Sequence, residues 1–348
     1  MSSTGNIGDK SASDLRSMRL KTPTVEELVK GIRVGNQSLL ARAITLVEST
    51  HPDHREKAYG IIEKCLTMKG ETLRIGITGV PGVGKSTFIE RFGTMLTAMG
   101  KKVAVLAVDP SSTVSKGSIL GDKTRMQQLV NDPMAFIRPS PSGTSLGGVA
   151  RKTRESIILC EAAGFDVILV ETVGVGQSET AVHSMVDFFL LLKLTGAGDE
   201  LQGIKRGIME MADAIVINKA EGENIKRAKQ AKSEFEKALH LYPPKENNWV
   251  PRVLTCSSIE GTGIPEIWEM IEDYANENRA SGHFDQKRKG QNRYWFQQTT
   301  ETLLKGQFYE QVQVKKSISK LEKAVEELKI SPFRAAEELL DAYRKGMK

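Results

Sequence analysis

The sequence GVPGVGKS at residues 79 to 86 matches the pattern G-x-x-x-x-G-K-[ST]. In that pattern backbone N–H groups surround the phosphates of a nucleotide, the lysine contacts the outer phosphates, and the hydroxyl binds Mg²⁺. Glycines are needed because such a loop uses backbone conformations that other residues rarely reach. We therefore expect nucleoside phosphate to bind here, at Gly79, Pro81, Gly82, Val83, Gly84, Lys85, Ser86 and Thr87.

A second polar segment, INKAEG at residues 217 to 222, follows an apolar stretch and predicts contacts to a base. Asn218 and Lys219 can frame the base, and Glu221 can accept hydrogen bonds from guanine N1–H and N2–H₂, a donor pair that adenine lacks. GTP-binding proteins carry N-K-x-D at this place, so the chain has Glu where Asp is usual. The alternative is that these residues are only the polar end of a strand.

The segment TCSSIEGTGI, residues 255 to 264, resembles the last base-binding motif of G proteins. There, a backbone N–H just after the serine contacts guanine O6, which points to Ser257 and Ser258. Two base motifs in this order favour GTP over ATP, because a site built for guanine leaves its polar groups unpaired around adenine.

Several carboxylates are candidate metal ligands beside the phosphate loop. Glu171 opens ETVGVGQSE (171 to 179), where most GTPases have D-x-x-G, and the Gly174 N–H can bind a γ-phosphate. Asp109 and Asp122 lie in the segment where a first switch belongs, although Asp109 could instead cap a turn and Asp122 a helix. Oxygen ligands suit Mg²⁺. The predicted metal set is Ser86, Asp109, Asp122 and Glu171.

Short apolar strands separated by helices must position these residues. The expected strands are residues 73 to 78, 102 to 109, 166 to 172, 187 to 194, 212 to 219 and 251 to 256. This alternation predicts an α/β fold with a mainly parallel sheet flanked by helices, in which ligands bind beyond the carboxyl ends of the strands. A capping box at Thr24 and Glu27 and later apolar spacing predict helices before the sheet, including one from His54 to Met68.

Three parts follow from this pattern. They are a helical N-terminal extension (1 to 70), a P-loop GTPase domain (71 to 278) and a helical C-terminal arm (279 to 348). Apolar residues at three- and four-residue spacing in the arm usually pack on their own domain, but the arm follows a complete nucleotide fold, so a homodimer contact is a second use.

Composition and charge argue against a secreted, a membrane-spanning or a nucleic-acid-binding protein. The 348 residues are 39% hydrophobic and 26% charged, with a net charge of +6, which is ordinary globular composition. Three scattered cysteines and a polar N-terminus without an apolar core predict a cytoplasmic protein without secretion signal or membrane span. The basic run at residues 285 to 296 is interpreted as solvated or subunit-facing rather than as a nucleic-acid site.

The order of GVPGVGKS, VDPSS, LGDKTRM, ETVGVGQSE, GAGDELQGIKRGI and NKAEG resembles the MeaB/ArgK-type P-loop GTPases, which include the methylmalonic aciduria type A proteins. The resemblance covers nearly the whole chain. It implies a Mg²⁺-dependent, homodimeric GTPase that binds GTP and GDP and serves as a chaperone of cobalamin-dependent acyl-CoA mutases, gating cofactor loading and protecting the mutase. By the same resemblance, residues 196 to 205 form a third switch in which Lys205 approaches the nucleotide.

The predicted catalytic set is therefore Lys85, Asp109, Glu171 and Lys205. Gln177 is only a candidate for orienting water, and Lys205 could equally be a solvent-exposed helix lysine beside Arg206. Two other functions stay open: a nucleotide-dependent kinase linked to arginine or ornithine transport, which needs an acceptor pocket with a base, and a nickel-inserting GTPase, which would normally show a Cys/His cluster.

Overall fold

The computed structural model describes residues 23–68, 70–108, 126–139, 146–172, 178–195 and 206–347. The chain divides into two compact units, Met1–Ser281 and Gly282–Lys348. Each is described by itself below.

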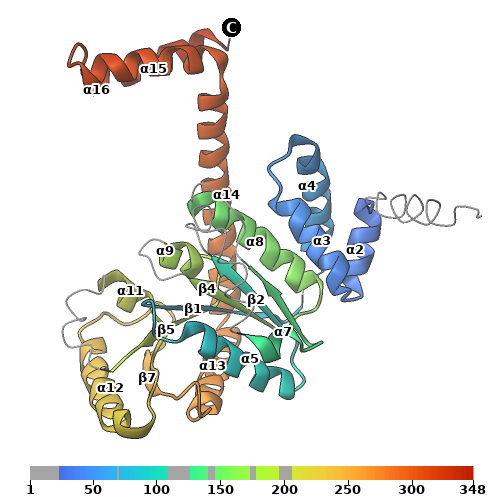
Figure 1. Ribbon diagram of the computed structural model, residues 1–348, viewed down its shortest axis with the longest axis vertical. Helices are drawn as coiled ribbons and strands as arrows, with labels where there is room; N and C mark the ends of the chain where they lie inside the picture. Colours follow the sequence, from blue (N-terminus) through green and yellow to red (C-terminus); the bar gives the residue numbers. More distant parts are fainter. Residues whose placement is uncertain are drawn as a thin grey trace, which may run out of the picture. The chain divides into compact units, whose positions relative to one another are not determined.

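A seven-stranded sheet forms the centre of the first unit (Figure 1). Every pairing between these strands is parallel, and the strand order is β3-β2-β4-β1-β5-β6-β7. The strands are β1 (Leu73–Gly79), β2 (Val103–Val108), β3 (Ala135–Arg138), β4 (Val167–Thr172), β5 (Phe188–Lys193), β6 (Ala214–Ile217) and β7 (Arg252–Thr255). The predicted α/β fold is confirmed, and the six expected strands are all present.

Strand β3 is the one that the apolar pattern does not reveal. It has four residues, AFIR, lies at the edge of the described sheet and pairs with β2. Two of the four residues are only half-buried, so the segment lacks the continuous apolar run of the inner strands.

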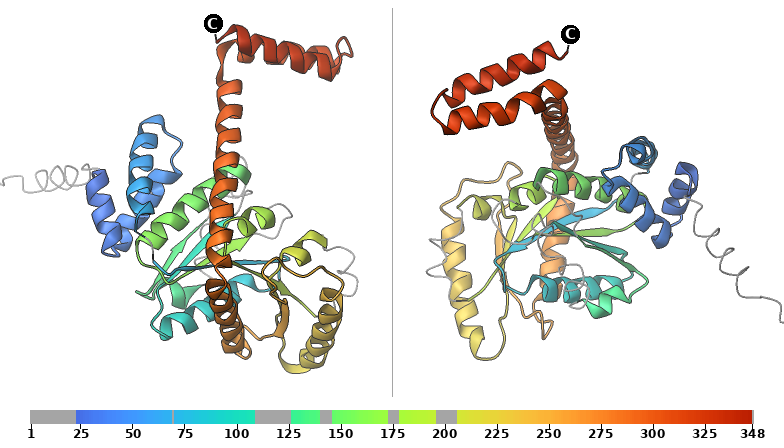
Figure 2. Two further views of the ribbon diagram at one scale, coloured as in Figure 1. Left: turned by 180° about the vertical axis from the view of Figure 1, so that it is seen from behind. Right: turned by 45° about the horizontal axis from the view of Figure 1, so that its top comes forward.

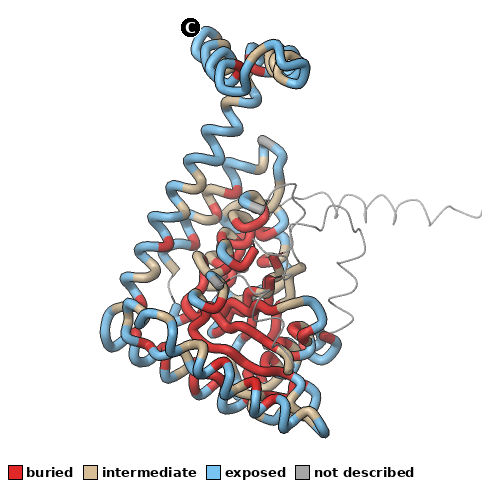
Figure 3. The backbone as a smooth tube through the Cα atoms, turned by 90° about the vertical axis from the view of Figure 1, so that its left-hand side faces the viewer, coloured by how far each residue is buried: buried red, intermediate tan, exposed pale blue. Residues whose placement is uncertain are grey.

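Helices cover both faces of this sheet (Figure 2). Helix α5 packs on β1 and β2 and contacts α13, whereas α8 packs on β2 and α9 on β1 and β4. Helix α12 packs on β6 and β7. Burial concentrates in the strands (Figure 3), where Phe188, Phe189 and Ile215 are fully buried. The helices that follow or connect the strands are α5 (Lys85–Ala98), α7 (Gln127–Val130), α8 (Leu146–Ala162), α9 (Ser178–His183), α11 (Arg206–Met211), the 3₁₀ turn η1 (Gly222–Asn224), α12 (Ile225–Leu239) and α13 (Ile264–Ala280).

Three helices precede the sheet: α2 (Val25–Arg33), α3 (Gln37–Glu48) and α4 (Pro52–Leu66). The capping box at Thr24 and Glu27 is present as predicted, and the third helix begins two residues earlier than expected, at Pro52. All three helices contact α8. The Gln37 amide also donates to the carbonyls of Pro133 and Ala135, which blocks the open edge at β3.

The described residues of the second unit form three helices joined by short turns. The unit contains α14 (His283–Glu310), α15 (Val312–Glu326) and α16 (Pro332–Lys345), and α15 packs along α16. Large apolar side chains are exposed on it, including Phe296 (72%) and Phe333 (84%). Among the residues described in either unit, no helix is both long and apolar enough to cross a membrane.

Candidate functional site

The loop between β1 and α5 has the backbone that its glycines predict. Gly79, Gly82 and Gly84 have φ values of +154°, +80° and +94°. A Cβ atom at Gly79 would lie 2.6 Å from the Leu192 carbonyl oxygen, and one at Gly84 would lie 2.8 Å from Asn218 Nδ2. Both contacts are too short for any side chain, so glycine is required by conformation and by space.

Lys85 is held by the loop itself. Its Nζ donates to the carbonyls of Gly79 (2.9 Å) and Val80 (3.5 Å), and the residue is only 9% exposed. Burial lowers the pKa of Lys85, while the carboxylates of Glu171 and Glu179 act in the opposite direction. The lysine is therefore a partly desolvated cation at the start of α5, where it can exchange loop carbonyls for phosphate oxygens.

The carboxyl end of β4 brings further polar groups beside this loop. Glu171 pairs in register with Ile77 of β1 and Ala107 of β2. The next residue, Thr172, donates its hydroxyl to Thr78 Oγ1 at 2.8 Å, which ties the ends of β4 and β1 together. Ser86, in the first turn of α5, is half-buried. Two of the predicted metal ligands thus lie on adjacent elements at one edge.

Glu179 is a buried carboxylate near Lys85 that sequence analysis did not single out. It lies in the first turn of α9, is 4% exposed, and is close enough to affect the charge of Lys85. A buried carboxylate is rare without a partner charge or ligand. The signal for it in the sequence is an acidic residue three positions after the last glycine of ETVGVGQSE.

The end of β6 contacts the phosphate loop directly. Asn218 is 1% exposed and its Nδ2 donates to the Val83 carbonyl at 2.9 Å. Lys219 has a φ of +60°, and its Cε would lie 3.9 Å from a Cβ at Gly84. The Glu221 side chain carries a buried oxygen, Oε2, that has no hydrogen-bond partner among the described residues. Such an orphaned carboxylate oxygen is costly unless a ligand supplies a donor.

The loop after β7 closes this side of the site. Ser257 is fully buried and Ser258 is 6% exposed. The Ser258 hydroxyl donates to Asn218 Oδ1 at 2.8 Å, and Ser257 Oγ accepts from the backbone N–H of Glu260 at 3.0 Å. The two predicted base motifs therefore meet at Asn218, although 40 residues separate Asn218 from Ser258 in the sequence.

Four predicted site residues lie outside the described residues: Asp109, Asp122, Gly174 and Lys205, as does Gln177. The described segments hold no group of three or more His, Cys, Asp and Glu side chains arranged to bind a metal ion. The metal set and the third switch therefore stay predictions.

Comparison with known proteins decides the family. The family model described as "Methylmalonyl Co-A mutase-associated GTPase MeaB" matches residues 40–313. The chain belongs to this family. It is accordingly a GTPase that binds GTP, as the resemblance implied.

Members of this family and a solved structure match along most of their lengths. GTPase ArgK of Escherichia coli K12 is 52% identical over 278 residues, covering 80% of this chain and 84% of that protein. The mitochondrial methylmalonic aciduria type A homolog of Mus musculus is 46% identical over 330 residues, covering 92% of this chain and 80% of that protein. The crystal structure of a LAO/AO transport system kinase superposes with a TM-score of 0.73 at 41% identity, covering 92% of this chain and 98% of the kinase chain.

Proposed function

We propose that this GTPase is a Mg²⁺-dependent switch that acts as a chaperone for a cobalamin-dependent acyl-CoA mutase such as methylmalonyl-CoA mutase. Hydrolysis of GTP to GDP and phosphate times a change in the surface offered to the mutase, and that change controls cofactor loading and protection. The mutase is supported by the names of the family and of its mouse member. The guanine site is supported by one observation above all, the buried Oε2 of Glu221, which is unpartnered within the described part of the chain.

The Glu221 carboxylate fits a guanine base. It accepts from N1–H and N2–H₂, so that the orphaned oxygen gains a donor on binding. The Ser258 N–H donates to O6, and the Lys219 stem, which lies beside Gly84, covers a face of the ring. Glu221 is one methylene longer than the usual Asp, and it lies directly before the turn η1 in extended conformation, with φ −124°.

The phosphates are bound by the glycine loop and Lys85. Loop N–H groups and the first turn of α5 supply donors, and the positive end of that helix favours the negative charge. Lys85 leaves the carbonyls of Gly79 and Val80 and stabilises charge that develops on the transferred phosphoryl group, with water as acceptor. When bound, Mg²⁺ would neutralise charge on the phosphate oxygens, and Ser86, Glu171, Asp109 and Asp122 are the residues that would hold it.

In this proposal, two glycine-rich segments couple the nucleotide state to the partner. Gly174 and Lys205 belong to the two glycine-rich segments that follow β4 and β5, and a γ-phosphate can order such segments until hydrolysis releases them. A mutase that prefers one state must shift nucleotide affinity by the same factor, about 5- to 150-fold for a typical allosteric pair. Lys205 transmits the effect by reaching either the phosphates or Glu171.

The C-terminal arm makes a homodimer in this proposal. Its exposed apolar side chains, such as Phe296 and Phe333, would be covered by a second copy. Light scattering at micromolar concentration should give a dimer, and deletion of residues 280 to 348 should give a monomer. A dimer that survives the deletion would remove the arm from the interface.

The partner role is tested by GTP hydrolysis. Rates are measured for wild type and Lys205→Ala, each with and without the cobalamin-dependent mutase of the same organism. We expect the mutase to change the wild-type rate and to change the Lys205→Ala rate much less. An unchanged wild-type rate would contradict the proposed chaperone switch. Equal stimulation of both proteins would contradict only the coupling role of Lys205.

A kinase is the second candidate, favoured by the name of the solved relative, a LAO/AO transport system kinase. It requires transfer of the phosphoryl group to an acceptor other than water. Incubation with labelled GTP and arginine or ornithine separates the two functions, because a kinase yields a labelled acceptor and a hydrolase yields inorganic phosphate.

A further inference from the structure

The Asn218 carboxamide joins three separate parts of the site. Its Nδ2 donates to the Val83 carbonyl at 2.9 Å. Its Oδ1 accepts from the Ser258 hydroxyl (2.8 Å), the Ser258 N–H (3.3 Å) and the Cys256 thiol (3.4 Å). The two backbone groups fix the orientation of the amide, because an N–H can only donate and a carbonyl can only accept.

Oδ1 thus receives more donors than it has lone pairs. A carbonyl oxygen has two lone pairs, yet three donors point at this one. The hydroxyl makes the shortest contact. Cys256 is 1% exposed, and burial raises the pKa of its thiol to about 12, so that it stays protonated and donates weakly. If the Ser258 N–H turns away, the hydroxyl and the thiol still supply one donor for each lone pair of Oδ1.

We propose that the Ser258 hydroxyl is a positioning group that holds Asn218 against the phosphate loop while the Ser258 N–H turns to guanine O6. The inference rests on the proposed guanine site and deepens it. One residue then serves the base with its backbone and the phosphate loop with its side chain. Without the hydroxyl, the single N–H must serve both Asn218 and O6, and a buried amide oxygen is left with only a thiol.

The consequence for the phosphates follows from close packing. Asn218 Nδ2 would lie 2.8 Å from a Cβ at Gly84, and it bonds the carbonyl of the preceding Val83. A shift of Asn218 therefore moves the loop immediately before Lys85. Base contacts and phosphate contacts are coupled through this amide, and Ser258 sets the coupling without touching a phosphate.

A double-mutant cycle tests the role. The Kd of GDP is measured by calorimetry, in full-length protein, for wild type, Ser258→Ala, Asn218→Ala and the double variant. We expect Ser258→Ala alone to weaken binding about 5- to 10-fold, the effect of one hydrogen bond to a buried acceptor. In the Asn218→Ala background the same change should alter Kd by less than about twofold, because the hydroxyl has lost its target.

A second variant, Ser258→Thr, separates the loss of the hydroxyl from a loss of folding. Ser258→Thr keeps the hydroxyl and should bind GDP within about twofold of wild type, while thermal melting reports the folding of every protein. Equal losses in both backgrounds, or no loss in Ser258→Ala, would overturn the positioning role, as would a Thr variant that folds but binds as poorly as Ala. A wild-type protein that binds no GDP would instead overturn the proposed function.

Discussion

The two edges of the sheet use polar residues in opposite ways. At the amino edge, three aspartates directly precede β4, β5 and β6, and each accepts from a backbone N–H of a neighbouring segment. Asp166 accepts from Lys102, Asp187 from Arg74 and Asp213 from Phe189, at 2.7 to 2.9 Å. At the carboxyl edge, a Glu221 oxygen has no partner among the described residues, and Lys85 rests on loop carbonyls.

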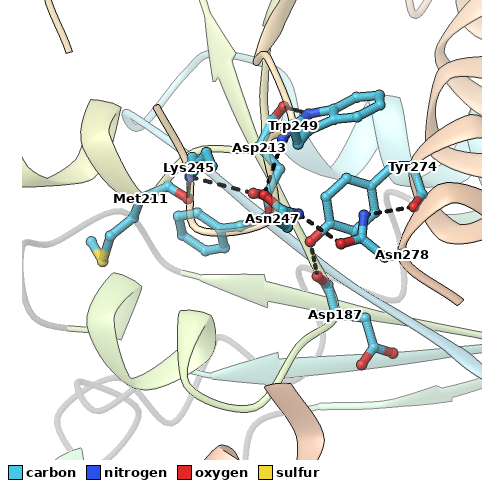
Figure 4. Close-up of polar contacts among 9 residues, drawn as sticks. Asp187, Met211, Asp213, Lys245, Asn247, Trp249, Tyr274 and Asn278 are labelled. Atoms are coloured by element: carbon cyan, nitrogen blue, oxygen red, sulfur yellow. Dashed lines mark hydrogen bonds and ion pairs between the residues drawn. The ribbon is translucent and has the colours of Figure 1, made fainter. Parts of the chain in front are cut away.

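The amino edge continues into a network that the protein completes by itself (Figure 4). Lys245 Nζ lies 3.3 Å from Asp213 Oδ1, Trp249 Nε1 donates to the Asp213 carbonyl at 2.8 Å, and the Tyr274 hydroxyl donates to the Asp187 carbonyl at 3.1 Å. These bonds fasten the segment before β7 and helix α13 to the sheet. Polar groups paired within the protein stabilise the fold, whereas groups kept for a ligand cost stability and serve function.

The largest expected effect is at Lys85. Lys85→Ala should lower GTP hydrolysis about 100-fold or more, because a positioned donor to the transferred phosphoryl group is lost. The melting temperature should change little, since the hydrogen bonds of Lys85 are made to carbonyls of its own loop. Lys102→Ala, an exposed lysine near the amino edge, is the control and should hydrolyse GTP as wild type does. Full turnover in Lys85→Ala would contradict the role of the loop.

The amino edge should give the reverse result. Asp213→Ala should lower the free energy of unfolding by about 2 kcal/mol, because it removes a buried acceptor and the partner of Lys245. Its Kd for GDP should stay that of wild type. Asp273→Ala, which breaks the exposed pair with Arg252, should cost about 0.5 kcal/mol or less in urea unfolding. If Asp213→Ala folds but binds GDP more weakly than wild type, the claim that the amino edge serves stability and not nucleotide binding would be wrong.

Much of the contrast between the amino and carboxyl edges of the sheet could be predicted from the sequence, but not all of it. The inner strands are continuous apolar runs, and the glycine loop has fixed spacing, so both could be located. The partner of each aspartate depends on strand order: Asp187 bonds Arg74, 113 residues away, because β1 lies beside β5. The orphaned oxygen of Glu221 and the three donors on Asn218 arise from packing between distant loops, which periodicity does not encode.

A pH effect should sharpen the account of Lys85. Burial lowers its pKa in the free protein, and phosphate favours its charged form, so GTP binding should take up a proton at alkaline pH. Below the lowered pKa the affinity should be constant, and above it the affinity should fall by up to about tenfold per pH unit. Calorimetry in buffers of different ionisation enthalpy measures the uptake. Lys85→Ala should lack it, and uptake that persists in that variant belongs to another group.

The carboxyl edge as a guanine site is tested most directly by the Kd of GDP and IDP for wild type and Glu221→Ala. IDP differs from GDP only by the absence of the N2 amine, which the Glu221 carboxylate is proposed to bind. Wild type should prefer GDP by about tenfold, the effect of a hydrogen bond to a charged group, and Glu221→Ala should bind the two nucleotides equally. An unchanged preference for GDP in Glu221→Ala, or none in wild type, would contradict the account.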